Sequence, residues 1–568
     1  MSLDPITFEV IRNALVAATD EMVLTLRRAA YSTNIKTRSD FSTAFFDTEL
    51  RAVAQGFTQP VHLGSMVEQV PKAVRTYGAE RLGPGDVIVT NDPHPSGVHL
   101  NDVSLISPVH VDGELLGYVA NLAHHVDVGG GAPASIGAFK EVFQEGVIIP
   151  PVRLVEGGVI VRDVFKLILA QIRSKHETGG DFRAQVAANA TGVRRIRALA
   201  ARHGRQTLRA AMGELLDYTE RRTRAELAGL PHGVYASEGT VDNDGYTDEP
   251  VHLRARIELA ADGARFDTIG SDPQRRAPVN STYAMTFSAC AYALKCLIDP
   301  DLPVNDGFYR VIELDAPLGT VTNCAWPGAV VGGWETQTRL VDVMFRALLP
   351  AFEHRLPAGT KAMMCQAGFG SLDLAKGKYV CFYDTLAGGY GGRLDRDGPD
   401  AVQTHGQNTE NAPIEETELN YPVRIDRLCL VEDSDGAGRR RGGLGVRKDY
   451  RFDRPTTFTI LADRDKAGPH GALGGHPGRK AEYVLIRDGE ETRLGSKTTV
   501  ELVAGDLLSV RSCGGGGYGP PEEREPERVL RDVLEGKVSA ERARAVYRVA
   551  IDGRTVDAAA TDQLRSTG

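Results

Sequence analysis

Apolar positions have helical spacing at the start of the chain and strand-like spacing soon after. A helix ending around Tyr31 is predicted by apolar residues that fall near one side of it: Ile6, Val10, Leu15, Met22 and Leu26. Asp4-Pro5 is a favourable start, because Asp caps helix N-termini and Pro fits the first helical position. Residues 41–55 then predict a strand, a turn and a second strand.

A β-hairpin is predicted further along. Residues 86–91 have a short strand pattern, and the two segments 103–111 and 114–123 are both rich in apolar residues. Asp112-Gly113 stands between these two segments and is a strong signal for a two-residue hairpin turn. We therefore expect 103–111 and 114–123 to pair as antiparallel strands.

The middle of the chain has helical periodicity, at 163–176 and from 181 to about 228, with a break expected at His203-Gly204. Beyond about residue 235, short strands alternate with turn residues. Strands are predicted at 237–242, 251–259, 265–270, 423–432, 446–452, 457–462 and 507–512. Two further helices are predicted near 281–298 and 336–350, and a charged helical tail closes the chain.

These patterns predict an α+β protein with four parts. They are an α/β N-terminal region that carries the hairpin (1–162), a helical segment (163–235), a large β-rich domain (236–520) and a C-terminal helical tail (521–568).

Composition excludes several classes of protein. The 568 residues include 62 glycines without a collagen period, and the net charge of −9 argues against a dedicated nucleic-acid binder. The seven cysteines are odd in number and form no C-x-x-C pair, which favours reduced thiols over a disulfide framework. The start of the chain has no signal-peptide pattern, and no apolar run is long enough to span a membrane. We expect a cytoplasmic protein.

Nucleotide motifs are absent or out of context. The sequence contains no P-loop pattern. Gly514, Gly516 and Gly519 satisfy G-x-G-x-x-G, but a run of four glycines does so almost automatically, and too few residues follow for the required parallel-sheet unit. We expect a tight structural turn there, and any ATP used in the chemistry is expected to bind another chain.

Histidines and aspartates cluster at the open end of the hairpin. Five of the fourteen histidines lie within 32 positions: His94, His99, His110, His124 and His125. Three aspartates lie among them: Asp92, Asp102 and Asp127. Imidazoles with a carboxylate at one strand end could bind divalent Mn, Fe or Zn. A rim of hydrogen-bonded surface histidines is the alternative.

The expected register complicates a metal site. If Asp112-Gly113 is the turn, Asn101 faces His124, and Leu100 faces His125. Asp102 then shares a strand face with His125, while His99 shares one with His124. The chain must therefore turn or bulge near 97–102 for His99 and Asp102 to bind one ion.

At these residues the sequence resembles the hydantoinase B/oxoprolinase family: B-type subunits of ATP-dependent hydantoinases and lactamases, the C-terminal half of 5-oxoprolinase, and alpha-type subunits of acetone and acetophenone carboxylases. The matching stretches run nearly end to end. They include RSDFSTAFFD (38–47), NDPHPSGVHLNDVSL (91–105), AHHVDVGG (123–130), FQEGVIIPPV (143–152), HGQNTENAPIEETELNYPVRI (405–425) and GGGGYGPP (514–521). His94 and the segment GGWETQTR (332–339) differ from the residues usual at these positions in the family, and these differences put the identity of the substrate in doubt.

The resemblance implies a site for one divalent metal ion with two histidines and one aspartate. Carried over by motif, the ligands are His99, Asp102 and His124, with His125 as the fallback and Asp127 as a partner that orients an imidazole. Candidates for acid–base help lie in matching motifs: Asp40, His62, Asp92 and Glu145. Each is equally explained as a structural residue. The segment 405–422 either lines the same pocket or only holds a loop in place.

The activity that the resemblance implies is ATP-dependent hydrolysis of a cyclic amide. An A-type partner would use ATP and Mg²⁺ to phosphorylate the substrate, and this chain would complete the hydrolysis at its metal. The partners expected are this A-type subunit, in a hetero-oligomer with more than one copy of each, and a small cyclic amide or ketone, without nucleic acid or membrane. The alternatives are a subunit of a ketone carboxylase and a non-catalytic scaffold for the A-type partner.

Overall fold

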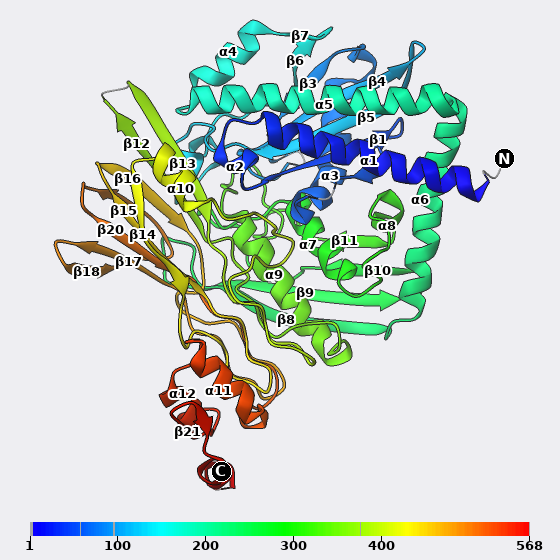
Figure 1. Ribbon diagram of the computed structural model, residues 1–568. Coiled ribbons are helices and arrows are strands. Elements are labelled where there is room, and N and C mark those ends of the chain that lie inside the picture. The colour runs from blue at the N-terminus through cyan, green and yellow to red at the C-terminus, as the bar shows by residue number, and fades with distance from the viewer. Residues whose placement is uncertain (1–3, 57, 95–96, 375–376, 567–568) are drawn as a thin grey trace.

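The computed structural model describes residues 4–56, 58–94, 97–374 and 377–566 (Figure 1). It contains 34% helix and 26% strand, which confirms the predicted α+β class. The N-terminal part is built on a seven-stranded antiparallel sheet with the order β2-β1-β5-β4-β3-β6-β7. Its strands are β1 (Phe41–Asp47), β2 (Ala52–Gln55), β3 (Val87–Thr90), β4 (Asp102–Val111), β5 (Glu114–His124), β6 (Val152–Glu156) and β7 (Val159–Ile160).

Helices cover both faces of this sheet. Helices α1 (Pro5–Ala29) and α5 (Lys175–His203) lie side by side on one face, and α3 (Pro60–Tyr77) packs on the other (Figure 1). Phe41 and Phe45 of β1 pack with the first pair of helices, and Ala44 and Phe46 pack with α3. Successive side chains of a strand point to opposite faces, so β1 is buried at every position.

The helix boundaries follow local sequence signals. Asp4 accepts hydrogen bonds from the first turn of α1, which confirms the predicted cap. The predicted break at Gly204 is confirmed, because its φ of 84° ends α5 before α6 (Arg205–Ala228). The helix predicted over 163–176 is shorter: α4 spans Arg162–Ala170. The short α2 (Thr33–Lys36) and the long α3 were not predicted, although Met66, Val70 and Val74 of α3 recur at helical spacing and are buried.

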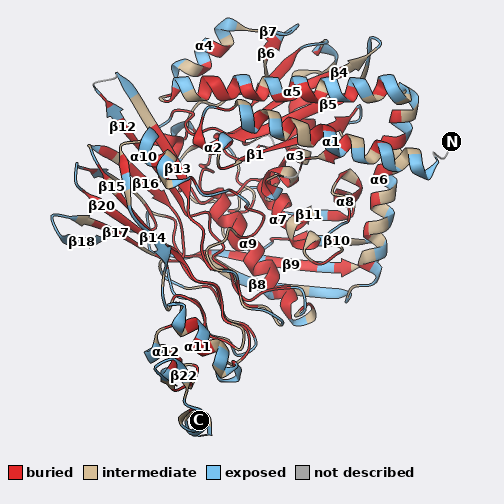
Figure 2. Cartoon of the chain, viewed as in Figure 1, coloured by how far each residue is buried: buried red, intermediate tan, exposed pale blue. Residues whose placement is uncertain are grey.

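A second sheet of four strands lies below the first in the view of Figure 1. Its order is β11-β10-β9-β8, from β8 (Gly233–Val241), β9 (Val251–Ala260), β10 (Gly263–Asp267) and β11 (Ile312–Asp315). Helices α7 (Tyr283–Lys295), α8 (Asp306–Tyr309) and α9 (Gly333–Leu348) lie between it and the N-terminal part. Every residue of α9 except Arg346 is buried, so this helix runs through the centre of the molecule (Figure 2).

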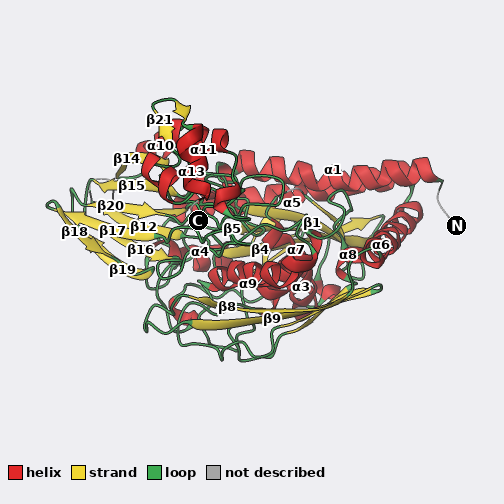
Figure 3. Ribbon diagram, turned by 90° about the horizontal axis from the view of Figure 1, so that it is seen from below, coloured by secondary structure: helices red, strands yellow, loops and turns green. Residues whose placement is uncertain are grey.

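Two further sheets pack face to face through one apolar core in the C-terminal part (Figure 3). One sheet contains β12 (Gln366–Asp373), β13 (Lys378–Thr385), β16 (Thr456–Leu461) and β19 (Lys497–Leu502). The other contains β14 (Val423–Leu430), β15 (Val446–Phe452), β17 (Glu482–Arg487), β18 (Glu490–Arg493) and β20 (Leu507–Arg511). The remaining α-helices and strands are α10 (Ile414–Asn420) and those of the C-terminal tail: α11 (Pro526–Leu534), α12 (Ala540–Ala545), β21 (Ile551–Asp552), β22 (Thr555–Val556) and α13 (Ala558–Ser566).

The predicted hairpin forms, but its predicted register is wrong by one residue. Next to the turn, His110 pairs with Leu115 as expected. A β-bulge follows, after which Val109 pairs with Gly117 and leaves Leu116 as the extra residue. From there to the open end, the pairing is shifted by one residue, so that Asp102 rather than Asn101 faces His124. The bulge therefore moves Asp102 and His124 onto one face of the hairpin.

The glycine run 514–517 does not form the expected tight turn. Its glycines are buried against the backbones of other segments, and a Cβ atom on Gly515 or Gly516 would overlap the carbonyl oxygen of Tyr390 or His470. Gly515 N donates a hydrogen bond to Gly443 O at 2.9 Å. The missing side chains let several chain segments pack backbone to backbone here.

Across the residues that the structure describes, none of the helices combines the length and apolar character needed to span a lipid bilayer.

Candidate metal centre

Three side chains of metal-binding type converge at the open end of the hairpin. His99, Asp102 and His124 each offer a ligand atom, and these atoms all lie within 4.8 Å of one another. Asp102 begins β4, His124 ends β5, and His99 precedes β4 in a turn closed by the hydrogen bond from Asp102 N to His99 O at 3.0 Å. The turn that the sequence required near 97–102 is thus confirmed. It lets two residues that are three apart in sequence point to one place.

The atoms that face each other in this group are buried and have no hydrogen-bond partner among the described residues. They are His99 Nε2, His124 Nε2 and both carboxylate oxygens of Asp102. His99 Nε2 lies 3.0 Å from Asp102 Oδ2, but the contact does not have hydrogen-bond geometry. Buried polar atoms without partners are costly, and the ligand atoms of these three residues lie within 4.8 Å of one another. The donor set of two imidazoles and one carboxylate fits a divalent transition-metal ion.

Asn34 holds the His124 ring in place. Its side-chain amide donates a hydrogen bond to the His124 carbonyl at 2.7 Å and lies 2.9 Å from His124 Nδ1. The His124 backbone N–H donates to Asp40 O at 3.0 Å, which fixes the end of β5 beside the start of β1. The contact fixes the orientation of the ring, so that Nε2 faces the other two ligand-type residues. Because the Asn34 amide nitrogen is a donor, Nδ1 accepts in this contact, and an ion at Nε2 would replace the proton that a neutral ring then carries there. Asn34 lies in a short helix, and no motif in the sequence pointed to it.

Burial and neighbouring charges keep lone pairs available in this group. Burial alone would raise the pKa of Asp102, but the adjacent His99 and His62 outweigh it and hold that pKa well below its usual range. Burial, followed by the nearby His99, lowers the pKa of His124 well below its ordinary value. A carboxylate and a neutral imidazole are the protonation states that bind a metal ion.

His62 and Asp40 stand next to the three ligand-type residues. His62, in the first turn of α3, has its Nε2 atom 3.7 Å from Asp102 Oδ1 and 3.9 Å from Asp40 Oδ1. Burial raises the pKa of Asp40, and the charges of His62 and Arg38 oppose that rise. Both residues were candidates for acid–base help, and the structure brings both to the site.

Residues from the distant second half of the chain close the site. Trp334, in the first turn of α9, has its ring centroid 6.1 Å from that of His62 and 6.2 Å from that of His99. Tyr383 of β13 stacks on His124 with centroids 4.6 Å apart and rings inclined by 18°. The sequence marked the Trp334 segment as unusual, whereas Tyr383 was missed because it sits in an ordinary strand pattern.

Arg38 joins these parts. Its guanidinium donates hydrogen bonds to Asn34 Oδ1 and to Tyr383 O, both at 2.8 Å, and it lies 3.8 Å from Asp384. The side chain is fully buried. It therefore links the residue that orients His124 with the strand that carries Tyr383, and it was not predicted although it lies in the quoted motif 38–47.

His125 and Asp127 have other contacts. His125 Nε2 lies 2.9 Å from Gln185 Oε1, and its ring packs on Phe182, so it points to α5 on the other face of the hairpin. Asp127 accepts hydrogen bonds from the backbone and side chain of Arg173 at 2.9 and 3.1 Å. Among the described residues, Asn34 rather than Asp127 is the hydrogen-bond partner of an imidazole in the ligand group.

Asp92 and Glu145 also have structural contacts. Asp92 accepts a hydrogen bond from the backbone N–H of His94, and His94 Nε2 lies 3.1 Å from Gly328 O. Glu145 Oε1 accepts hydrogen bonds from the backbone N–H groups of Val330 and Val331 at 2.6 and 2.7 Å. Burial raises the pKa of Glu145 to about 8, against the effect of these two bonds. Glu145 thus holds the loop that leads to Trp334.

The segment 405–422 clamps the elements that carry the site. Asn408 N donates to Gln59 Oε1 at 2.6 Å at the start of α3, and Glu416 accepts from the hydroxyl of Thr37 at 2.8 Å. Glu410 O accepts from Arg38 Nε at 3.2 Å. These contacts support the second of the two expectations for this segment, in which side-chain hydrogen bonds hold a long loop.

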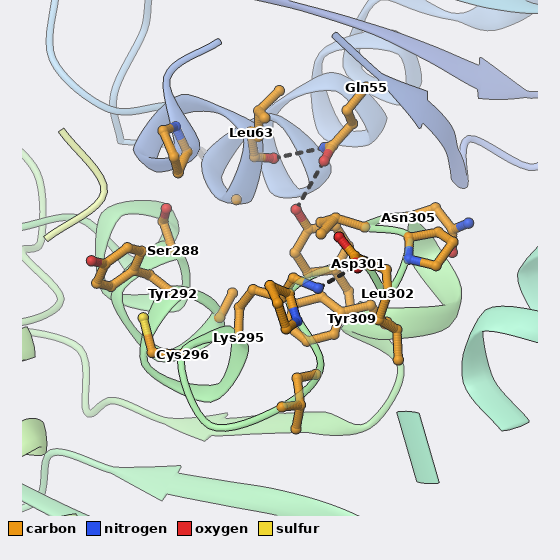
Figure 4. A pocket seen from close by; sticks show the side chains of 18 of the residues that line it. Gln55, Leu63, Ser288, Tyr292, Lys295, Cys296, Asp301, Leu302, Asn305 and Tyr309 are labelled. Atoms are coloured by element: carbon orange, nitrogen blue, oxygen red, sulfur yellow. Dashed lines mark hydrogen bonds between the residues drawn. The ribbon is translucent and has the colours of Figure 1, made fainter. Parts of the chain in front are cut away.

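A cavity of about 800 Å³ lies beside the first turn of α3 (Figure 4). Leu63, Tyr292, Lys295 and Tyr309 are among its lining residues, which do not include the three metal-type ligands. Gln55 bridges its wall, since its amide donates to Leu63 O at 3.1 Å and accepts from the Tyr309 hydroxyl at 3.2 Å. The cavity is thus separate from His99, Asp102 and His124 (the metal group), although both adjoin the first turn of α3.

Residues 4–521 match the Hydantoinase B/oxoprolinase family. The chain belongs to this family. An uncharacterized protein of Methanocaldococcus jannaschii is 40% identical over 99% of this chain and all of its own length. The crystal structure of the ATP-dependent caprolactamase from Pseudomonas jessenii superposes with a TM-score of 0.92 at 30% identity, over the whole of both chains. An acetone carboxylase structure has the same TM-score at 19% identity, over 99% of this chain and 83% of that one, and so shares the fold.

Proposed function

We propose that this chain is the metal-dependent B-type subunit of an ATP-dependent enzyme that hydrolyses a cyclic amide. The observation that carries the proposal is the convergence of His99, Asp102 and His124, whose facing atoms are buried without partners among the described residues. The similarity to the caprolactamase supports a cyclic amide as the substrate class.

Each nearby side chain has a role in this proposal. His99, Asp102 and His124 would hold one divalent ion of Mn, Fe or Zn, which would supply Lewis acidity toward the substrate or a bound water. His62 would take or give a proton at Nε2, and Asp40, 3.9 Å away, would stabilise its charged form. Trp334 and Tyr383 would exclude bulk water from the reacting group.

The ATP-dependent step belongs to an A-type partner in this proposal. The sequence has no P-loop, and its one G-x-G-x-x-G string is buried among other backbone segments. The similar chains of a Pseudomonas hydantoinase and of the caprolactamase each carry the name of one subunit of a larger enzyme, which supports an assembly of different chains. We propose that the partner activates the amide with ATP and Mg²⁺, and that the activated amide is hydrolysed at the metal of this chain.

The test is co-expression of this chain with an A-type subunit from the same organism. ATP consumption and ring opening are measured with ε-caprolactam, 5-oxoproline and hydantoin, together with the metal content of the purified complex. We expect ATP-dependent ring opening of at least one of these amides, and loss of both activity and metal in His99→Ala. His94→Ala is the matched control, because His94 lies in the same segment but outside the ligand group.

Two outcomes would replace this proposal. ATP turnover driven by bicarbonate with an aryl or alkyl ketone, without turnover of cyclic amides, would indicate a carboxylase subunit. Unchanged turnover and unchanged metal content in His99→Ala would indicate a scaffold for the A-type partner.

A further inference from the structure

A buried amide that Tyr383 links to His124 has donor atoms without a partner among the described residues. Gln366 begins β12 and is fully buried. Its Oε1 atom accepts a hydrogen bond from the Tyr383 hydroxyl at 3.4 Å, while its Nε2 atom has no such partner in the described part of the chain. In this arrangement the Tyr383 hydroxyl donates, so Oε1 is the acceptor and Nε2 carries the two unused N–H groups.

Tyr383 contacts both Gln366 and His124. In the β12–β13 ladder Gln366 faces Thr385 and Gly368 faces Tyr383, so the side chains of Gln366 and Tyr383 lie on one face of the sheet. The Tyr383 ring stacks on His124. Arg38 holds this end of β13 through Tyr383 O at 2.8 Å and Thr385 Oγ1 at 2.5 Å. The Tyr383 side chain therefore links the Gln366 amide to the His124 ring.

The chemistry of its surroundings restricts what can bind Gln366. The unused atoms of His99, Asp102 and His124 are lone-pair donors suited to a cation, whereas Gln366 Nε2 presents hydrogen-bond donors. A buried N–H without a partner destabilises the free protein, and a ligand oxygen removes that cost. An oxygen atom of a bound molecule, placed near the metal ion, suits both the cation site and the Gln366 donors, because its lone pairs accept hydrogen bonds.

We propose that Gln366 binds the amide oxygen of the substrate, free or phosphorylated, through Nε2–H. Tyr383 is a positioning residue, because it acts by holding the Gln366 amide and the His124 ring. This inference rests on the proposed function, since it takes the substrate to be a cyclic amide. A preorganised N–H donor at such an oxygen stabilises the negative charge that develops when water attacks the neighbouring carbon.

The first test compares Gln366→Met with the wild type in the complex with the A-type subunit. Methionine has a similar volume but no donor. We expect kcat/KM for ring opening to fall about 100- to 1000-fold, as when one oxyanion donor is removed, with unchanged metal content. An unchanged kcat/KM would overturn the proposal. Inhibition by inorganic phosphate separates the two forms of the oxygen: weaker inhibition in the variant indicates the phosphorylated form, and equal inhibition the free amide.

The second test uses stability and does not depend on the activity. Methionine also removes the oxygen that accepts from the Tyr383 hydroxyl, so the comparison is made in a Tyr383→Phe background, where that bond is already absent. Because Gln366 Nε2 has no partner among the described residues, adding Gln366→Met to Tyr383→Phe in the purified chain should give unfolding at an equal or higher denaturant concentration. The matched control is Gln185→Met, since the Gln185 amide is buried and donates to Val103 O at 2.9 Å and to Asn121 Oδ1 at 2.8 Å. Gln185→Met, made in the same background, should unfold at a lower denaturant concentration than Tyr383→Phe alone.

The activity and stability measurements distinguish failure of the proposed function from failure of the Gln366 proposal. If the wild-type complex opens no cyclic amide, the proposed function fails, and the stability comparison still decides whether the Gln366 amide lacks a partner. A large drop in stability when Gln366→Met is added to Tyr383→Phe would show that the Gln366 donors already have partners in the free protein, and the inference would be overturned.

Discussion

Asp102 and His124 are direct partners across β4 and β5, so a carboxylate and an imidazole stand together on one face of the hairpin. His125 points to the opposite face, against Gln185. We therefore expect His124→Asn to lose bound metal and His125→Asn to retain it. Metal content of the purified proteins, together with the rise in melting temperature on metal addition, measures this difference.

The neighbouring pair makes the comparison well controlled, because both histidines are buried and lie at one strand end. His125→Asn is expected to lose some stability through its bond to Gln185, without loss of metal. The reverse pattern, with metal lost only in His125→Asn, would show that the bulged register does not hold in solution.

Asn34 should set the affinity for the metal ion, although it is not a ligand. Its amide fixes the His124 ring from the side opposite Nε2. Loss of such an outer partner usually weakens metal binding by about 10- to 100-fold, and we expect this for Asn34→Ala. Competition titration with a metal indicator gives the dissociation constant.

Asp127→Asn is the control for this titration. Its Oδ1 atom accepts from Gly129 N at 3.1 Å and from Arg173 N at 2.9 Å, and an asparagine keeps that oxygen. The dissociation constant should be unchanged. A weaker affinity in Asp127→Asn with no change in Asn34→Ala would reverse the assignment of the orienting residue.

Glu145 should make the folded protein less stable as the pH rises. Its pKa is about 8 in the folded protein, against an ordinary value of 4.5, because the carboxyl is buried. The folded pKa lies above the unfolded one, so this contribution is full below pH 4.5 and is lost as the pH rises through about 8. The whole loss is at most about 5 kcal/mol.

Denaturant midpoints from pH 5 to pH 8.5 measure this effect. Glu145→Gln keeps an oxygen for the N–H groups of Val330 and Val331 but cannot ionise. Its stability should fall less than that of the wild type over this range. Equal slopes for the two proteins would mean that Glu145 is ionised in the folded state at neutral pH.

The packed glycines should tolerate no side chain. A Cβ atom at Gly515 would overlap Tyr390 O and crowd Gly391 N. We expect Gly515→Ala to cost more than about 4 kcal/mol or to prevent folding, because rigid backbone has to move. Soluble yield and the denaturant midpoint measure the loss.

Gly213→Ala is the matched control. Gly213 lies inside α6, and outside the adjacent backbone of this helix no described atom lies within 4 Å of a Cβ placed there. Alanine is the better helix former, so this variant should be more stable by about 1 kcal/mol. Comparable losses in the two variants would show that glycine content, rather than close packing, matters at Gly515.

The sequence predicted the hairpin because turn chemistry and strand pattern are local. It could not predict the bulge at Leu116, because the turn signal at Asp112-Gly113 fixes the pairing only as far as the strands remain regular. One extra residue moved Asp102 onto the face of His124. In a regular hairpin Asp102 and His124 would have lain on opposite faces, and this conflict was thus a sign of the bulge.

The site was predictable only where its residues lie in one stretch of chain. Asp40, His62, His99 and His124 come from the first quarter of the sequence, and the resemblance to the family marked them. The residues that hold or cover them act through packing across long separations. Asn34 has an ordinary polar side chain in a short helix, and Tyr383 has an ordinary strand position, so neither carried a signal.

The distance along the chain between His124 and Tyr383 has a consequence for how the protein is made. Tyr383 stacks on His124 but follows it by 383 − 124 = 259 residues. At about 5–20 residues per second, a ribosome needs roughly 13 to 50 seconds to synthesise that interval. During this time the ligand residues have left the ribosome without their cover. Under the proposed function, a metal ion therefore has access to these residues until the C-terminal sheets fold.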